Sequence, residues 1–151
     1  MHITIVAAGR HKAGPLKALE QFYAERIRWP LAIREIEERR KLPPAELKLR
    51  EAELILAAMP KDAILVALDG RGKAFSSADF AQRFARWREA DAALAFAIGG
   101  ADGLAESVTD RAKLVLSLGA MTWPHLMVRG MLLEQIYRAQ QILAGHPYHR
   151  A

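Results

Sequence analysis

The last seven residues of the chain, GHPYHRA at 145–151, carry a dense set of reactive side chains. His146, Tyr148, His149 and Arg150 follow directly after a long apolar stretch. Imidazole and phenol groups can accept or relay a proton, and a guanidinium can hold a phosphate or stabilise an anion. Most chain ends are frayed and take little part in function. The pattern therefore indicates a functional tail.

A metal centre is a second chemistry that histidines can build. His146 and His149 are three residues apart, and His125 can approach them. Pro147 lies inside the pair, and neither a cysteine nor a carboxylate stands near it, whereas zinc sites draw their ligands from cysteine, histidine and carboxylate sets. We therefore expect no metal. Taken alone, His125 fits a histidine at the start of a helix that is bonded to backbone.

Three glycine-bearing strings follow apolar runs: LDG at 68–70, IGGADG at 98–103 and LGAMTWPH at 118–125. Glycine permits close approach of the backbone to a ligand, so three such bends at consecutive strand ends indicate a binding site. The second string does not make G-x-G-x-x-G, and the chain has neither a P-loop lysine nor a G-x-S-x-G elbow. The spacing disfavours a dinucleotide, a triphosphate and serine-hydrolase chemistry.

The elements that position these groups alternate along the chain. Short apolar or alternating runs predict strands at 3–9, 31–38, 63–70, 93–100 and 113–119, the second of them near an edge. Helical spacing, caps and prolines predict helices at 15–28, 44–58, 76–90, a short stretch ending near 111, and 124–144. The last helix is apolar on nearly every side between Leu126 and Leu133, which predicts that its first half is enclosed. This order predicts an α/β fold, a parallel sheet with helices on both faces, which binds ligands at the carboxyl ends of its strands.

Composition limits the class of protein. With 151 residues, of which 52% are hydrophobic, the chain is expected to form one domain with a substantial core. It has no cysteine, which excludes disulfides and thiolate catalysis. Neither a signal peptide nor a membrane-spanning run is recognisable, so we expect a soluble cytoplasmic protein.

Positive charge is concentrated in one segment. The net charge is +5, and residues 26–50 hold eight of the 22 lysines and arginines against four acids. Such a segment forms either a solvated surface or a phosphate-contacting one, and the excess favours a polyanionic partner such as nucleic acid.

Four strings carry a resemblance to a known family. IGGADG, LSLGAMTWPHLMVR at 116–129, EQIYRA at 134–139 and HPYHR at 146–150 occur in this order near the end of the chain. The sequence thereby resembles the RlmH family of SPOUT-class methyltransferases. That family methylates N3 of the pseudouridine at position 1915, in helix 69 of bacterial 23S rRNA. The likeness covers the whole chain, and its last third carries most of the specificity.

The resemblance implies a single SPOUT methyltransferase domain over 1–151 with a C-terminal trefoil knot. It implies a homodimer that binds S-adenosylmethionine and acts on the large subunit or the assembled ribosome. The residues expected to wrap the cofactor are Leu68, Gly100, Gly119, Ala120, Met121, Thr122, Trp123 and Pro124. Small residues and an apolar lining at these bends suit recognition of an adenine ring by backbone groups.

The resemblance also implies catalytic roles. Tyr148 or His149 is expected to take or relay the N3 proton, while Arg150 holds a phosphate or stabilises the imide anion. Arg129 is expected to contact RNA or the partner subunit. Packing across the dimer interface is the alternative for Tyr148 and Arg150.

The sequence departs from the family pattern at two places. Trp123 is bulkier than the side chain expected there, and the 39–50 segment contains proline where relatives are rich in lysine and glycine.

Two rival functions stay open. A non-catalytic RNA-binding protein would explain the charge but not the three glycine bends. A small-molecule enzyme would explain a pocket but not the basic segment.

Overall fold

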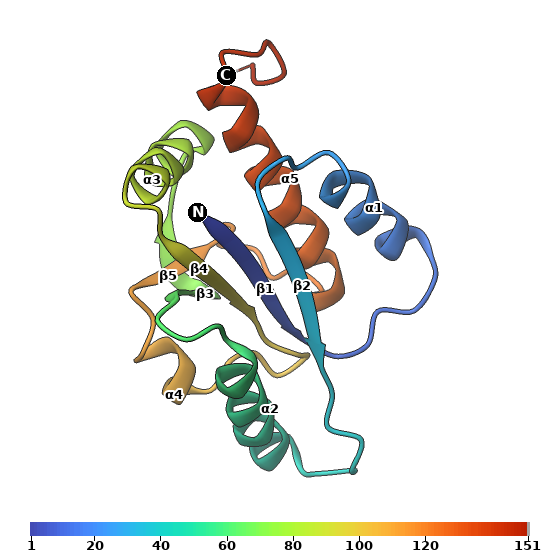
Figure 1. Cartoon of the computed structure of the whole chain (residues 1–151). Helices are drawn as coiled ribbons and strands as arrows, with labels where there is room; N and C mark the ends of the chain where they lie inside the picture. Colours follow the sequence, from blue (N-terminus) through green and yellow to red (C-terminus); the bar gives the residue numbers. More distant parts are fainter. Residues whose placement is uncertain (151) are drawn as a thin grey trace.

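The computed structural model describes residues 1–150 and shows a five-stranded parallel sheet covered by helices on both faces (Figure 1). The elements, in chain order, are β1 (His2–Ala8), α1 (Pro15–Ala24), β2 (Leu31–Ile36), α2 (Pro44–Ala58), β3 (Ile64–Ala74), α3 (Ser77–Glu89), β4 (Ala93–Ile98), α4 (Glu106–Thr109), β5 (Leu114–Ser117) and α5 (His125–Leu143). The strand order is β2-β1-β4-β3-β5, so β2 is the predicted edge strand. Ala151, the last residue of the predicted domain, lies outside the described residues.

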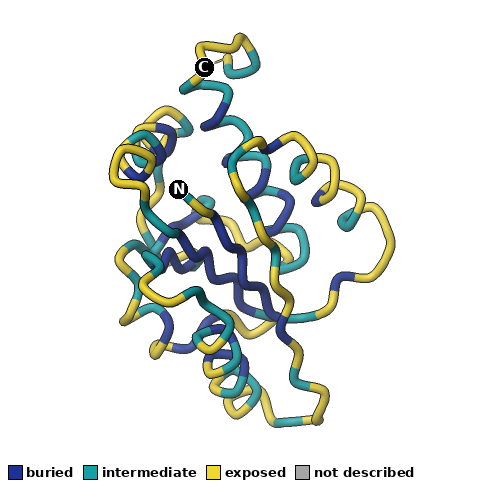
Figure 2. Tube along the Cα trace, viewed as in Figure 1, coloured by how far each residue is buried: buried dark blue, intermediate teal, exposed yellow. Residues whose placement is uncertain are grey.

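Alternation along β1 sends side chains to two separate hydrophobic cores. Ile3 and Ile5 belong to the core beneath α1, α3 and α5, while Val6 and Ala8 belong to the core beneath α2 and α4. Because successive side chains of a strand point to opposite faces, a strand that is covered on both faces is apolar throughout. Figure 2 shows the buried residues gathered along the central strands and the exposed ones on the outer helix faces.

The helix α5 packs between α1 and α3, as Figure 1 shows. Gly130 lies at the contact with α1, where a Cβ would come within 2.8 Å of Leu19 Cδ2 and would force that side chain to shift. The predicted enclosure of its first half is confirmed, since every residue of 125–133 is buried or partly buried. Within residues 1–150, no helix combines the length and apolar character needed to cross a lipid bilayer.

Two element boundaries differ from the prediction by four residues, and the others agree to within two. The helix α1 ends at Ala24 instead of 28, because the chain turns toward β2 and Gln140 of α5 binds the backbone of Arg26 and Arg28. The strand β3 continues to Ala74, past the predicted end at Gly70.

The extension of β3 passes through a bulge. Leu68 and Lys73 both pair with Leu116, so residues 69–72 leave the ladder between them. At Gly72 the two backbones come so close that a Cβ would lie 2.4 Å from the Val115 carbonyl oxygen. Only glycine fits there.

We therefore expect Gly72→Ala to lower the free energy of unfolding by about 1–3 kcal/mol, the usual cost of overpacking. Gly70→Ala is the matched control, because a Cβ at Gly70 would meet no atom within 4 Å. Denaturant unfolding of both variants measures the difference. Equal midpoints for the two would contradict the assigned contact.

Candidate functional site

A cavity of about 970 Å³ lies where β3 enters its bulge and where β4 and β5 end. It is lined by residues of all three glycine bends. All eight residues predicted to wrap a cofactor contribute to its wall: Leu68, Gly100, Gly119, Ala120, Met121, Thr122, Trp123 and Pro124. Three segments far apart in the sequence thus form one site because the strands run parallel.

The bends after β3 and β5 are tied together by Ser117. Its hydroxyl accepts a hydrogen bond from the Gly119 amide at 3.1 Å, and it lies 3.2 Å from the Gly70 carbonyl oxygen, to which it can donate. Gly119 itself has a φ of 117°, a conformation that favours glycine. Ser117 was not among the residues expected at the site, although a polar residue at the end of an apolar run is a signal that the sequence contains; the structure shows it buried.

The wall at residues 120–123 offers backbone groups to a ligand. Across the described chain, none of the amide or carbonyl groups of these four residues takes part in a hydrogen bond. The side chain of Met121 is 76% exposed and that of Trp123 is 40% exposed. The segment therefore presents unpaired backbone together with apolar side chains.

Two carboxylates near the cavity have shifted pKa values. A hydrogen bond from Arg71, at 3.0 Å, lowers the pKa of Asp69. Burial raises the pKa of Glu51, and the charge of Asp102 adds to this. The Glu51 carboxylate lies behind Gly100, where a Cβ would come within 2.9 Å of Oε2.

His125 lines the cavity at the first residue of α5. Burial lowers its pKa, and the charges of Arg129 and His11 lower it further, so the ring is neutral at pH 7. A neutral imidazole can donate or accept one hydrogen bond toward a ligand.

The tail is folded onto the second half of α5. The Tyr148 hydroxyl donates to Glu134 Oε1 at 3.0 Å, and its ring packs edge-on against Tyr137 at a centroid distance of 4.8 Å. Arg138 Nη1 lies 3.1 Å from His149 Nδ1, and Arg150 is exposed. Burial raises the pKa of Tyr148, with the neighbouring Tyr23 and Glu134 adding to the shift, so the phenol stays protonated.

The structure does not bring the tail and the cavity together within one chain. None of residues 145–150 lines the cavity of the glycine bends. The tail reaches back along α5 as far as Glu134, nine residues from His125, which is about 14 Å along a helix axis.

Arg129 lies in the interior, 1% exposed, and not on a surface that RNA or another subunit could reach. Its guanidinium forms an ion pair with Glu35. This placement argues against the predicted contact of Arg129 with RNA.

Three of the eight basic residues in the segment 26–50 pair with nearby acids, namely Arg39, Arg40 and Arg50. Arg40 and Arg50 contact Glu38 at 2.9 and 3.1 Å, and Arg50 also reaches Glu53 at 2.8 Å. Arg39, Arg40 and Arg50 are nonetheless accessible to solvent. Among the described residues, no group of three or more His, Cys, Asp or Glu side chains is arranged to hold a metal ion.

Comparison with known proteins identifies the family of this chain. The family model described as "Predicted SPOUT methyltransferase" matches residues 1–149. The chain belongs to the SPOUT methyltransferase family. The resemblance to RlmH proteins is also confirmed, because relatives named Ribosomal RNA large subunit methyltransferase H match over their full length. The protein of Rhodospirillum centenum is 57% identical over 100% of both chains, and that of Paramagnetospirillum magneticum is 50% identical over 99% of both.

A solved structure shows the same SPOUT fold. The SpoU methyltransferase AviRb from Streptomyces viridochromogenes, crystallised in complex with the cofactor AdoMet, matches with a TM-score of 0.51 and 13% identity. The match covers 93% of this chain and 58% of AviRb. The predicted parallel sheet with helices on both faces is confirmed, and the C-terminal trefoil knot is consistent with it and stays a prediction.

We expect the imidazole of His125 to titrate below pH 6.5, the value for an unperturbed histidine. Since folding disfavours the imidazolium, this residue's contribution to stability is present above pH 6.5 and is lost as the pH falls from 6.5 through the lower pKa of the folded state. An NMR titration of the His125 ring measures its midpoint directly. A midpoint at or above 6.5 would show that the ring is not held as described.

Proposed function

We propose that this chain is an S-adenosylmethionine-dependent methyltransferase that modifies the RNA of the large ribosomal subunit. Its proposed target is N3 of the pseudouridine in helix 69 of 23S rRNA, and its substrate is the large subunit or the assembled ribosome in the cytoplasm. One observation carries the proposal: three glycine bends form a single cavity whose wall at 120–123 offers unpaired backbone groups. Membership of the SPOUT family and the names of its relatives support it.

The cavity fits the cofactor in size and lining. Its volume of about 970 Å³ lies within the 300–1,000 Å³ that is common for ligand pockets. The amides and carbonyls of residues 120–123 can pair with the edge of an adenine ring, while Leu68 and Leu118 supply an apolar lining. When bound, the cofactor supplies a methyl group on a positively charged sulfur.

The protein's own work is to orient the target base and to manage its N3 proton. A base nitrogen must lose its proton to become a nucleophile, and a positioned side chain can assist this loss. His149 is the proposed acceptor or relay, and Arg150 is the proposed partner for a phosphate or the imide anion. Tyr148 serves this site better as a hydrogen-bond donor than as a base, because its raised pKa keeps the proton on the phenol.

A homodimer completes the proposed site. Since the tail cannot line the cavity of its own chain as folded here, a site with both parts needs a second copy. A second cavity of about 450 Å³, between α1, α3 and α5, shares Leu118 and Gly119 with the first. Beside it, α1 exposes Leu19 and Phe22, at 36% and 47%, which suits an apolar contact between copies.

The function is tested by transfer of labelled methyl groups to ribosomes from a strain that lacks the endogenous enzyme. We expect incorporation into 23S rRNA that carries the pseudouridine and much less into the unmodified uridine form. We also expect the apparent affinity for the ribosome to fall steeply as salt rises, because phosphate contacts release counterions. Cofactor binding without any transfer to RNA, or transfer only to a small molecule, would contradict the proposal.

The sharing of the site between copies has its own test. Truncation after Gly145 should keep cofactor binding and abolish transfer, whereas Gly119→Val should abolish cofactor binding because a β-branched residue does not adopt a φ of 117°. Each variant alone should be inactive. When the two are co-expressed, half of the dimers are mixed and each has one intact site, so roughly a quarter of the normal activity should return. No recovery from demonstrably mixed dimers would refute the shared site.

A further inference from the structure

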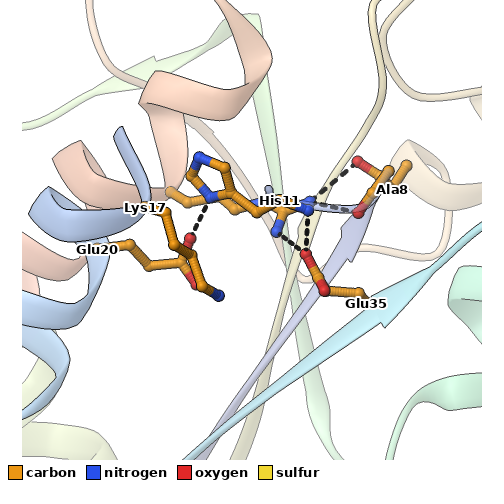
Figure 3. A network of polar contacts seen from close by, with 7 residues as sticks. Ala8, His11, Lys17, Glu20 and Glu35 are labelled. Carbon is orange, nitrogen blue, oxygen red and sulfur yellow. Dashed lines mark hydrogen bonds and ion pairs between the residues drawn. The ribbon is translucent and has the colours of Figure 1, made fainter. Parts of the chain in front are cut away.

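A chain of polar contacts joins the start of α5 to the edge of the sheet (Figure 3). Arg129, His11 and Glu20 in this chain are buried, whereas the side chain of Glu35 is 32% exposed. Arg129 Nη1 lies 2.5 Å from Glu35 Oε2 on β2. Its Nη2 donates to the carbonyl oxygen of Gly9 at 2.7 Å and to that of Ala8 at 3.2 Å. One guanidinium thus binds α5 to β2 and to the end of β1.

The contacts continue from Glu35 toward α1. The same Oε2 accepts the backbone N–H of His11 at 2.7 Å, and His11 Nδ1 lies 2.5 Å from Glu20 Oε2. Burial alone would raise the pKa of Glu35, but the hydrogen bonds from Arg129 and His11 lower it, so its carboxylate is ionised. Figure 3 shows the ring of His11 facing Glu20 on one side, with the Glu35 carboxylate on the other.

Stability alone gives little reason for this arrangement. Burying Arg129 costs its hydration, and the ion pair with the partly exposed Glu35 has to offset that cost. Arg129 Nε adds a further cost, since it is buried and has no hydrogen-bond partner in the described part of the chain. The contacts of Arg129 do fix the orientation of α5 relative to β1 and β2, because the guanidinium has a fixed planar geometry and bonds to three acceptors.

Arg129 constrains the part of α5 that lies beside the cavity. Arg129 is one turn after His125, and residues 119–124 lead straight into that first turn of α5. His125 Nε2 lies 3.8 Å from the position that a Cβ on Gly9 would take, so the first turn rests on the end of β1. Any rotation of this turn would carry the cavity wall with it.

We propose that Arg129 and Glu35 are positioning residues for the cofactor site. Their pair fixes the first turn of α5 against β1 and β2, and so holds the backbone of 120–123 in the geometry that receives the ligand. The inference deepens the proposed function and rests on it, because the ligand is the S-adenosyl cofactor.

The other end of the same helix offers a matched control. Gln140 is also buried, accepts the Arg28 amide at 2.6 Å and donates to the Arg26 carbonyl at 3.3 Å. It therefore ties α5 to the segment before β2, but it lies eleven residues, about 16 Å along the helix axis, from Arg129. A substitution there removes a comparable buried contact without touching the cavity wall.

The test compares Arg129→Met, Arg129→Lys, Glu35→Gln and Gln140→Met in the full chain. Calorimetric titration with S-adenosylhomocysteine gives affinity, and thermal unfolding gives stability. We expect Arg129→Met to weaken binding on the order of tenfold, or about 1.4 kcal/mol. Arg129→Lys and Glu35→Gln should each cause a smaller loss, since they keep part of the pairing. Gln140→Met should lower Tm but bind like the unsubstituted protein.

A second measurement needs no ligand. The backbone amide chemical shifts of residues 119–124 should change in Arg129→Met and Glu35→Gln but not in Gln140→Met. Methyl transfer should show a raised KM for the cofactor with a smaller change in kcat.

The outcomes separate the two proposals. Unchanged affinity and unchanged amide shifts in Arg129→Met, or equal losses in Gln140→Met, would overturn the positioning role while leaving the cofactor site in place. If Arg129→Met fails to fold, Arg129→Lys and Glu35→Gln decide by the same criteria. Failure of the unsubstituted chain to bind S-adenosylhomocysteine would overturn the proposed function, and this inference with it.

Discussion

Parallel pairing of β4 with β3, and of β3 with β5, is the constraint on which the candidate site depends. It sends three chain segments out of the sheet at the same edge. Their backbones can then approach one another only where side chains are small or absent. Ser117 ties two of these segments together, and Glu51 fills the space behind Gly100 that a side chain would need. Backbone geometry therefore places the cavity, and side chains such as Ser117 and Glu51 support it.

Much of the fold could be predicted because its elements carry strong local signals. Unbroken apolar runs marked β1 and β4, and the Ser76 side chain caps α3 as its position suggested. The extension of β3 could not be predicted, because DGRGKA is polar and has neither the alternation nor the apolar character of a strand. It pairs with β5 only because Gly72 allows close approach, a property of two segments that no local pattern contains.

The candidate site, like the fold, could be predicted from the sequence only where local patterns mark it. Glycine bends after apolar runs led to the cavity, and the structure gathers all eight predicted residues around it. The roles of Glu35 and His11 were not predictable, since they depend on contacts to Arg129 across much of the chain. Arg129 was expected to contact RNA or the partner subunit, whereas it is buried and the ion pair with Glu35 compensates its burial. For the tail, the sequence revealed its residue types but not their distance from the cavity.

The unpaired backbone at 120–123 has a consequence for inhibition of such a protein. A compound that hydrogen-bonds to main-chain amides and carbonyls contacts atoms that every amino acid possesses. Point mutations at Ala120, Met121, Thr122 or Trp123 would change the rim of the pocket but leave those anchoring atoms in place. Resistance would then have to arise by distorting the bend itself, and the chain would lose its own ligand together with the drug.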